Sequence, residues 1–144
     1  MRYLSLLLVI VLAGCQHSGS TAGASDTAGK KDSWITYTGT LPCADCIGII
    51  TELTLHEQLQ DPDFQFKLKE TYQGVSAGKD AIFNSEGSYR LLPGNGDTVV
   101  IQLNPDKDRN LQRFFQRVGE RELKLLDRDK HPIEGNLNYS LTSR

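Results

Sequence analysis

Apolar and polar side chains alternate with a period of two along most of the chain beyond residue 33. In residues 49–56 the odd positions are mainly aliphatic and the even positions are mainly polar. The alternation returns in residues 64–72, where aromatic and aliphatic side chains alternate with Gln, Lys and Thr. A strand places successive side chains on opposite faces, so both segments are predicted to be strands with one buried face. The turn sequence DPD lies between them, which favours a hairpin with a solvent-facing outer side.

Further short segments of strand character follow along the rest of the chain. They are separated by turn sequences rich in Gly, Asn, Asp and Pro, namely NSEG, PGNGD, NPDKD and DRDK. Regular spacing of this kind is typical of an antiparallel meander or barrel. We therefore predict an all-β fold, a small antiparallel β-barrel of about eight strands. The other predicted strand segments are WITYTG, AIFN, SYRLL, TVVIQL, RFFQRV, ELKLL and NLNYSLT.

Residues 111–118 permit a helical alternative, because their apolar side chains have the i, i+3, i+4, i+7 spacing. The run is short and lies between polar turn sequences. Length therefore favours a strand for RFFQRV.

The inward positions that the alternation predicts carry large side chains. A filled core is the expectation, because a cavity must be held open by curvature that a sequence does not show. A modest cavity for a small ligand is the alternative. The predicted inward residues are Leu53, Leu55, Phe64, Phe66, Leu68, Tyr72, Leu91, Val99, Ile101, Leu103, Phe115, Leu123, Leu125, Leu137, Tyr139 and Leu141.

The N-terminus has the layout of a signal peptide. A positive charge at Arg2 precedes a short apolar run, which is well below the roughly 20 residues that a membrane-spanning helix needs. The sequence LAGC, which ends at Cys15, resembles the bacterial lipobox, in which cleavage precedes a cysteine that carries the lipid. We predict a lipoprotein signal peptide over residues 1–14 and lipidation of Cys15, which would hold the chain at a membrane. An ordinary secretory signal is the alternative.

Residues 15–33 contain no large apolar side chain and are rich in Gly, Ser, Thr and Ala. Such a composition predicts a flexible tether, and residues 34–144 then form one domain. Gln16 stands where inner-membrane lipoproteins commonly have Asp, so we expect the outer membrane, facing the periplasm. The formal net charge of −2 offers no basic field for nucleic acid.

The sequence LPCADCIG places Cys43 and Cys46 three positions apart. In an oxidising compartment such a pair tends to form a disulfide, provided that the Cα atoms come within about 4.4 to 6.8 Å. Free thiolates would instead be soft ligands for Cu(I). Two sulfurs supply only half of the ligands of a tetrahedral site, so His56 is a candidate third ligand. A thioredoxin-type oxidoreductase is not expected, since the βαβ context is missing. The disulfide and the metal site both stay open at this point.

Four stretches between residues 37 and 142 carry a family resemblance. YTGTLPCADCIGIITELTL, FQFKLKETYQG and the later LKLLDRDKHPI with LNYSLT resemble the N-terminal domain of the NlpE family of envelope lipoproteins. The resemblance implies a lipocalin-like small barrel at the outer membrane, associated with copper and with envelope stress through a sensor kinase. This chain resembles a short, single-domain member. Ile47 stands where the family commonly has proline.

We therefore expect a lipid-anchored module that binds or senses, and we expect no enzyme, because no nucleophile and base are paired in the sequence. Its link to copper homeostasis or envelope stress would run through the Cys43 and Cys46 turn, with Cu(I) as the candidate cofactor. An envelope sensor kinase or another envelope protein is the expected partner. The alternative is a lipocalin-like carrier of a small apolar ligand, in which the two cysteines form a structural disulfide.

Overall fold

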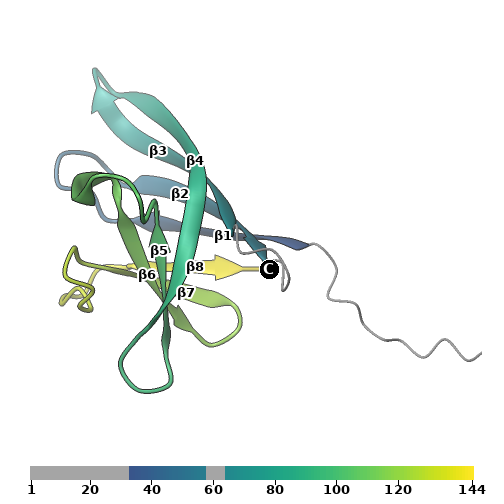
Figure 1. The fold of residues 1–144 in the computed structure, drawn as a ribbon. Coiled ribbons are helices and arrows are strands. Elements are labelled where there is room, and N and C mark those ends of the chain that lie inside the picture. The colour runs from purple at the N-terminus through teal and green to yellow at the C-terminus, as the bar shows by residue number, and fades with distance from the viewer. Residues whose placement is uncertain (1–32, 58–63) are drawn as a thin grey trace, which may run out of the picture.

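The computed structural model describes residues 33–57 and 64–144, which form a closed barrel of eight antiparallel strands (Figure 1). Each strand pairs with the next in the sequence, and β8 pairs with β1 to close the barrel. The predicted all-β barrel of eight strands is confirmed. In this described part of the chain no helix is long and apolar enough to cross a membrane. The elements are β1 (Ser33–Leu41), β2 (Ile49–Glu57), β3 (Gln65–Ser76), β4 (Lys79–Pro93), β5 (Val99–Leu103), the 3₁₀ helix η1 (Arg109–Leu111), β6 (Arg113–Val118), β7 (Glu122–Leu126) and β8 (Ser140–Ser143).

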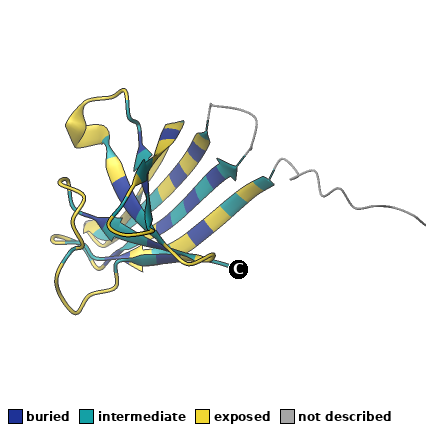
Figure 2. Ribbon diagram, turned by 60° about the horizontal axis from the view of Figure 1, so that its bottom comes forward, coloured by how far each residue is buried: buried dark blue, intermediate teal, exposed yellow. Residues whose placement is uncertain are grey.

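Burial alternates along the strands, as bands of buried and exposed residues in Figure 2 show. In β2 the side chains of Thr51, Leu53 and Leu55 are buried, whereas their neighbours are partly exposed. Inward side chains from all eight strands pack together in the barrel interior. The core consists of Tyr37, Leu41, Leu53, Leu55, Phe66, Leu68, Tyr89, Ile101, Leu103, Phe115, Leu123 and Leu141.

The predicted core differs from the observed one in a few positions. Leu91 and Leu137 were predicted to face inward, but they are 44% and 63% exposed. For Leu137 the reason is that β8 begins only at Ser140, so this residue lies in the preceding loop. The prediction omitted Tyr37 and Tyr89, which are nearly inaccessible to solvent. Other predicted inward residues are only partly buried, namely Phe64, Tyr72, Val99, Leu125 and Tyr139.

The predicted turn at NSEG is wrong, because β4 runs through it as one strand. Asn84 and Glu86 lie opposite Lys69 and Lys67 in the ladder with β3. Gly87 serves close packing here and not chain reversal, since a Cβ at this position would lie 2.6 Å from Oδ1 of Asn104. The segments AIFN and SYRLL therefore belong to one strand. RFFQRV is strand β6, as predicted, and the helix before it is a single 3₁₀ turn.

A second apolar cluster lies outside the barrel and consists of Val100, Phe114 and Leu126, with Leu92 packed against it. The two apolar faces of β5 and β6 explain why VVI and FF interrupt the alternation in the sequence. The loop after β7 folds back beside this cluster through a bridge between Leu126 and Pro132.

Asp127 organises that loop by accepting hydrogen bonds from the backbone N–H groups of Asp129 and His131, both at 2.8 Å. The bond from His131 is the main reason why the pKa of the Asp127 carboxyl lies below its usual range.

Polar groups occupy one end of the barrel interior. The carboxylate of Glu57 forms an ion pair with Arg117, and both side chains are less than one-third exposed. The Tyr89 hydroxyl donates a hydrogen bond of 3.1 Å to the backbone oxygen of His56, and burial raises the pKa of Tyr89. Nε of Arg117 is buried with no hydrogen-bond partner among the described residues. The turn with the two cysteines lies at the opposite end of β1 and β2.

Candidate functional site

The turn between β1 and β2 carries the cysteine pair. Cys43 and Cys46 are joined by a disulfide with a Cα–Cα separation of 5.3 Å. Both cysteines are partly buried, whereas Asp45 between them is exposed. A sulfur in a disulfide is not a thiolate, so in this state neither cysteine is a soft metal ligand.

Two backbone hydrogen bonds attach the residues after the disulfide to β3. The N–H of Ile47 donates to the oxygen of Gln73 at 3.1 Å, and the N–H of Gln73 donates to the oxygen of Gly48 at 3.0 Å. The side chain of Ile47 covers Gly74, where a Cβ would lie 3.1 Å from the Ile47 Cδ1 atom. A proline at position 47 would have no N–H to donate. The disulfide turn is therefore coupled to the outer part of β3.

His56 lies far from the disulfide. It pairs with Trp34 in the β1–β2 ladder, at the end opposite to the Leu41↔Ile49 pair, and its ring stacks on Trp34 with centroids 4.5 Å apart. Seven residues of strand separate it from Ile49, which is about 23 Å at 3.3 Å per residue. The structure therefore does not bring His56 to an ion held by the two sulfurs.

The residues that the structure describes contain no cluster of three His, Cys, Asp or Glu side chains suited to a metal ion. Among the described residues, the predicted copper ligands are thus reduced to the two sulfurs, which bind Cu(I) well only as thiolates. Cys15, the signal peptide of residues 1–14 and residues 15–32 of the predicted tether lie outside the described residues.

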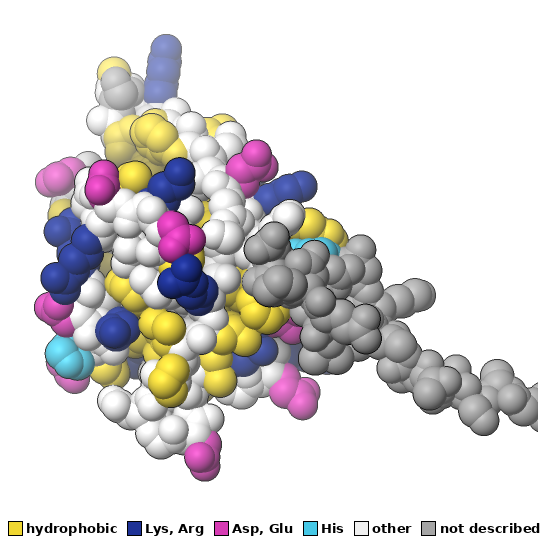
Figure 3. Space-filling view, in the orientation of Figure 1, with side chains coloured by type: hydrophobic (Ala, Val, Ile, Leu, Met, Phe, Trp, Pro, Cys, Tyr) yellow, Lys and Arg dark blue, Asp and Glu magenta, His cyan; other side chains and the backbone are white. Residues whose placement is uncertain are grey.

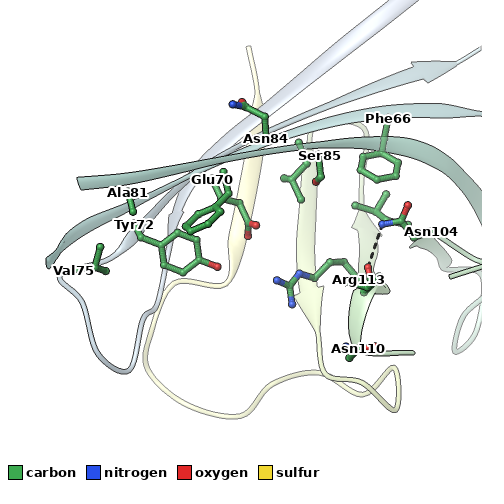
Figure 4. Close-up of a pocket in the computed structure, with 14 residues that line it drawn as sticks. Phe66, Glu70, Tyr72, Val75, Ala81, Asn84, Ser85, Asn104, Asn110 and Arg113 are labelled. Carbon is green, nitrogen blue, oxygen red and sulfur yellow. Dashed lines mark hydrogen bonds between the residues drawn. The ribbon is translucent and has the colours of Figure 1, made fainter. Parts of the chain in front are cut away.

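An open slot of about 640 Å³ lies near the disulfide turn, between the β3–β4 hairpin and the segment that leads into β6 (Figure 4). Phe66 and Leu68 of β3 and Phe83 of β4 line its hairpin side. Asn110 and Leu111 from the segment around η1 lie on the other side. The slot lies along the part of the β3–β4 hairpin beyond the β4–β5 ladder. Figure 1 shows this hairpin projecting beyond the other strands.

Three polar side chains point into this slot from two walls. Figure 4 shows Glu70 and Tyr72 on the hairpin, with Arg113 reaching toward them from the opposite side. Burial raises the pKa of Tyr72, the Glu70 charge raises it further, and the Arg113 charge lowers it. A smaller space of about 250 Å³ shares these three residues and is lined by Leu41 and Pro42 beside the disulfide.

Sequence reasoning did not find the slot. Glu70 and Tyr72 have the inward parity of β3, but Arg113 is contributed by a strand about forty residues further along. NPDKDRN indicated only a turn. A charged residue at an inward position near a strand end was the one available signal, because a filled interior does not accept a charge there.

The closed, sequentially connected antiparallel barrel and its disulfide turn define a small β-barrel domain. The family model of the NlpE N-terminal domain matches residues 37–136, and the chain belongs to this family. This confirms the resemblance seen in the sequence. Lipoprotein NlpE of Escherichia coli (strain K12) is 29% identical over 143 residues, which covers 96% of this chain and 53% of that protein. The chain thus spans about half the length of this relative. No solved structure gives a significant match.

Proposed function

We propose that the protein is an envelope lipoprotein that binds and senses, without turnover, and that its Cys43–Cys46 turn responds to redox state or copper. Membership of the NlpE family and the lipoprotein relative support the envelope assignment. The observation that carries the proposal is the pair of backbone hydrogen bonds that join Ile47 and Gly48, just after the disulfide, to Gln73 of β3. We call this pair of hydrogen bonds the clamp. A change at the sulfurs acts on Ile47 and Gly48, which follow Cys46 in the chain and are hydrogen-bonded to Gln73.

The clamp supplies a route from the sulfurs to the slot. A dithiol reductant passes two electrons and two protons to the disulfide, leaves two thiols on the protein and itself becomes a disulfide. The closed ring then opens, which relieves the constraint on the turn. The hydrogen bonds of Ile47 and Gly48 to Gln73 are expected to weaken, and Gln73 follows Tyr72, which lines the slot.

Copper enters this proposal only through the reduced turn. Two thiolates from the C-x-x-C pair match the preference of Cu(I) for soft ligands. The disulfide form does not fit the metal, because a neutral disulfide sulfur is a much weaker electron-pair donor than a thiolate. Copper and oxidant would therefore compete for the same two side chains.

The test is an anaerobic titration of the full chain with Cu(I) in the presence of a competing chromophoric chelator. We expect the reduced protein to bind about one Cu(I) per chain, because one thiolate pair is available. The oxidised protein and the Cys43→Ser/Cys46→Ser variant are expected to leave the metal with the chelator. Hydrogen exchange at the amides of Ile47 and Gln73 should accelerate on reduction.

His56→Ala is the matched control for the copper experiment. Since His56 lies at the other end of β2, its loss should change the Cu(I) affinity by less than about twofold. Equal binding by the oxidised protein or by the double serine variant would remove the thiol site from the proposal. Unchanged exchange at Gln73 after reduction would remove the coupling to the barrel.

The location that we propose is the periplasmic face of the outer membrane, with the chain held by lipid on Cys15 and with an envelope sensor kinase or another envelope protein as partner. The sequence LAGC, which ends at Cys15, and the residue Gln16 after it support this placement. Cells fed radiolabelled palmitate should incorporate label into the protein, and Cys15→Ser should abolish it while leaving the chain soluble after lysis. Undiminished labelling of Cys15→Ser would contradict the lipid site. Recovery of the wild type in the inner-membrane fraction would contradict the outer-membrane placement.

A further inference from the structure

One edge of β4 is open along more than half of the strand. β4 pairs with β3 over its first part, but its ladder with β5 runs only from Tyr89 to Pro93. Within residues 33–57 and 64–144, no strand pairs with the β5-facing edge of β4 between Lys79 and Gly87. The hairpin therefore projects past the end of β5, as Figure 1 shows.

The backbone groups that point to this edge can be identified by alternation. The oxygen of Ser88 accepts from the N–H of Asn104 at 2.9 Å, whereas the N–H of Tyr89 donates to Phe64 on the β3 side at 2.8 Å. Even-numbered residues of β4 thus face β5, and odd-numbered residues face β3. The β3–β4 ladder has no register shift before Tyr72. The N–H and C=O groups of Ile82, Asn84 and Glu86 therefore point to the open edge.

The usual protection of an open edge is weak here. Natural edge strands are shielded by charges, proline or bulges, but the central run AIFNS of residues 81–85 carries none of these features. Ile82 and Phe83 are each 58% exposed. Figure 3 shows apolar side chains gathered over the projecting end of the hairpin.

The slot lies directly beneath this edge. Ala81, Phe83 and Ser85 present their side chains to it, so residues of an added strand opposite Phe83 and Ser85 would point into the same space. Residues opposite Asn84 would point to solvent. Figure 4 shows the Asn84 side chain directed away from the cavity and Arg113 directed into it.

The positive charge of Arg113 also bears on the chemistry of a ligand in the slot. Among the described residues, no acidic side chain forms an ion pair with its guanidinium, although Glu70 lies in the same slot. An acidic group on the occupant would complement this charge. Repeating backbone donors and acceptors on one side, apolar walls below and a cation at the end specify an extended peptide.

We propose that the open edge of β4 binds an extended peptide segment of a partner protein by strand addition. The segment has two apolar residues at alternate positions, which enter the slot, and an acidic residue two positions further, which reaches Arg113. A small apolar ligand could fill the slot, but it would leave the three pairs of edge groups without partners.

The test uses the full chain in lipid nanodiscs and a fluorescein-labelled probe of sequence Thr-Leu-Thr-Phe-Thr-Asp-Thr. Hydrogen exchange read out by mass spectrometry with residue-level fragmentation should slow at Ile82, Asn84 and Glu86 by about tenfold or more at saturation. The amides of Phe83 and Ser85, which already bond to β3, should change much less. A matched peptide with N-methyl groups on its two central threonines keeps every side chain but loses the ladder, and it should bind about tenfold more weakly or worse.

Two variants test the edge and the cation separately by fluorescence polarisation. Asn84→Pro removes an N–H that points to the open edge without removing a hydrogen bond to β3, and it should lower the affinity for the probe at least about tenfold. Asn84→Ala should change this affinity by less than about twofold. Arg113→Gln should lower the affinity for this probe about fivefold or more. It should leave the affinity unchanged for a second probe in which Asn replaces the Asp. If Asn84→Pro fails to fold, the N-methylated peptide still tests whether backbone hydrogen bonds hold the probe on β4.

Three outcomes overturn the proposal. The first is equal affinity for the N-methylated and unmodified peptides. The second is the absence of binding by any peptide of this pattern at about 1 mM. The third is saturation of the slot by dodecanoate with no protection of the edge amides and no peptide binding, which would assign the slot to a small apolar ligand.

Discussion

Gly39→Ala should destabilise the barrel by about 1–3 kcal/mol, because a Cβ at this position has no room. It would lie 2.5 Å from the backbone oxygen of Ser140 and 3.0 Å from Cδ2 of Leu141. A backbone oxygen cannot rotate away, so β8 itself must shift. The β1–β8 ladder that closes the barrel has only two residue pairs, Tyr37↔Ser143 and Thr38↔Thr142. The substitution therefore acts on the shortest ladder of the barrel.

Urea unfolding followed by Trp34 fluorescence would measure the loss, and hydrogen exchange should show faster opening in β8 than in β3. Gly48→Ala is the matched control. Its Cβ would meet Cγ2 of Thr40 at 2.8 Å, but that methyl group belongs to an exposed side chain that can turn away. The control should cost less than about 1 kcal/mol. Equal losses for both glycines would show that the approach of β8 is not the cause.

Glu57→Ala should lower the free energy of unfolding by about 2–3 kcal/mol, somewhat less than for a fully buried ion pair. Glu57 and Arg117 are 17% and 29% exposed, so water screens the unpaired guanidinium only in part. The substitution leaves this charge inside the barrel, where Nε already has no hydrogen-bond partner among the described residues. Removing the second charge as well should recover most of the loss.

The double variant Glu57→Ala/Arg117→Met tests this cause. We expect the free energy of unfolding of the double variant to lie within about 1 kcal/mol of the wild-type value, so that the coupling in a double-mutant cycle is at least about 1 kcal/mol. Additive losses would contradict the charge argument. Spectrophotometric titration gives a second readout. Burial, and to a lesser extent the Glu57 charge, raise the pKa of Tyr89, so Glu57→Ala should move its alkaline transition to lower pH.

Parity predicted the strands well, because the two-residue period is a property of each strand alone. The bounds of β6 and β7 coincide with RFFQRV and ELKLL. NSEG failed as a turn for a reason outside the local sequence. Its Gly87 is required by the approach of Asn104, which belongs to another part of the chain. Local turn chemistry cannot distinguish a reversal from a site of close packing.

The candidate site was predicted only in part. LPCADCIG and the family resemblance directed attention to Cys43 and Cys46, and the structure places them at one end of the barrel. His56 was grouped with them because it follows on the next strand. Strand length separates them, since a strand extends about 3.3 Å per residue whatever its sequence. The open edge of β4 was not predicted, because an edge depends on where the neighbouring strand stops.

The sequence by itself determined that this chain forms strands with one apolar face and that a C-x-x-C turn joins the first two of them. Only the tertiary structure decided which charged side chains lie at inward positions and which of them meet. Glu57 pairs with Arg117 sixty residues away, whereas Glu70 and Arg113 face a slot that their side chains do not close. The physical reason is that parity fixes the face of a side chain, but the stagger of neighbouring strands fixes its height in the barrel.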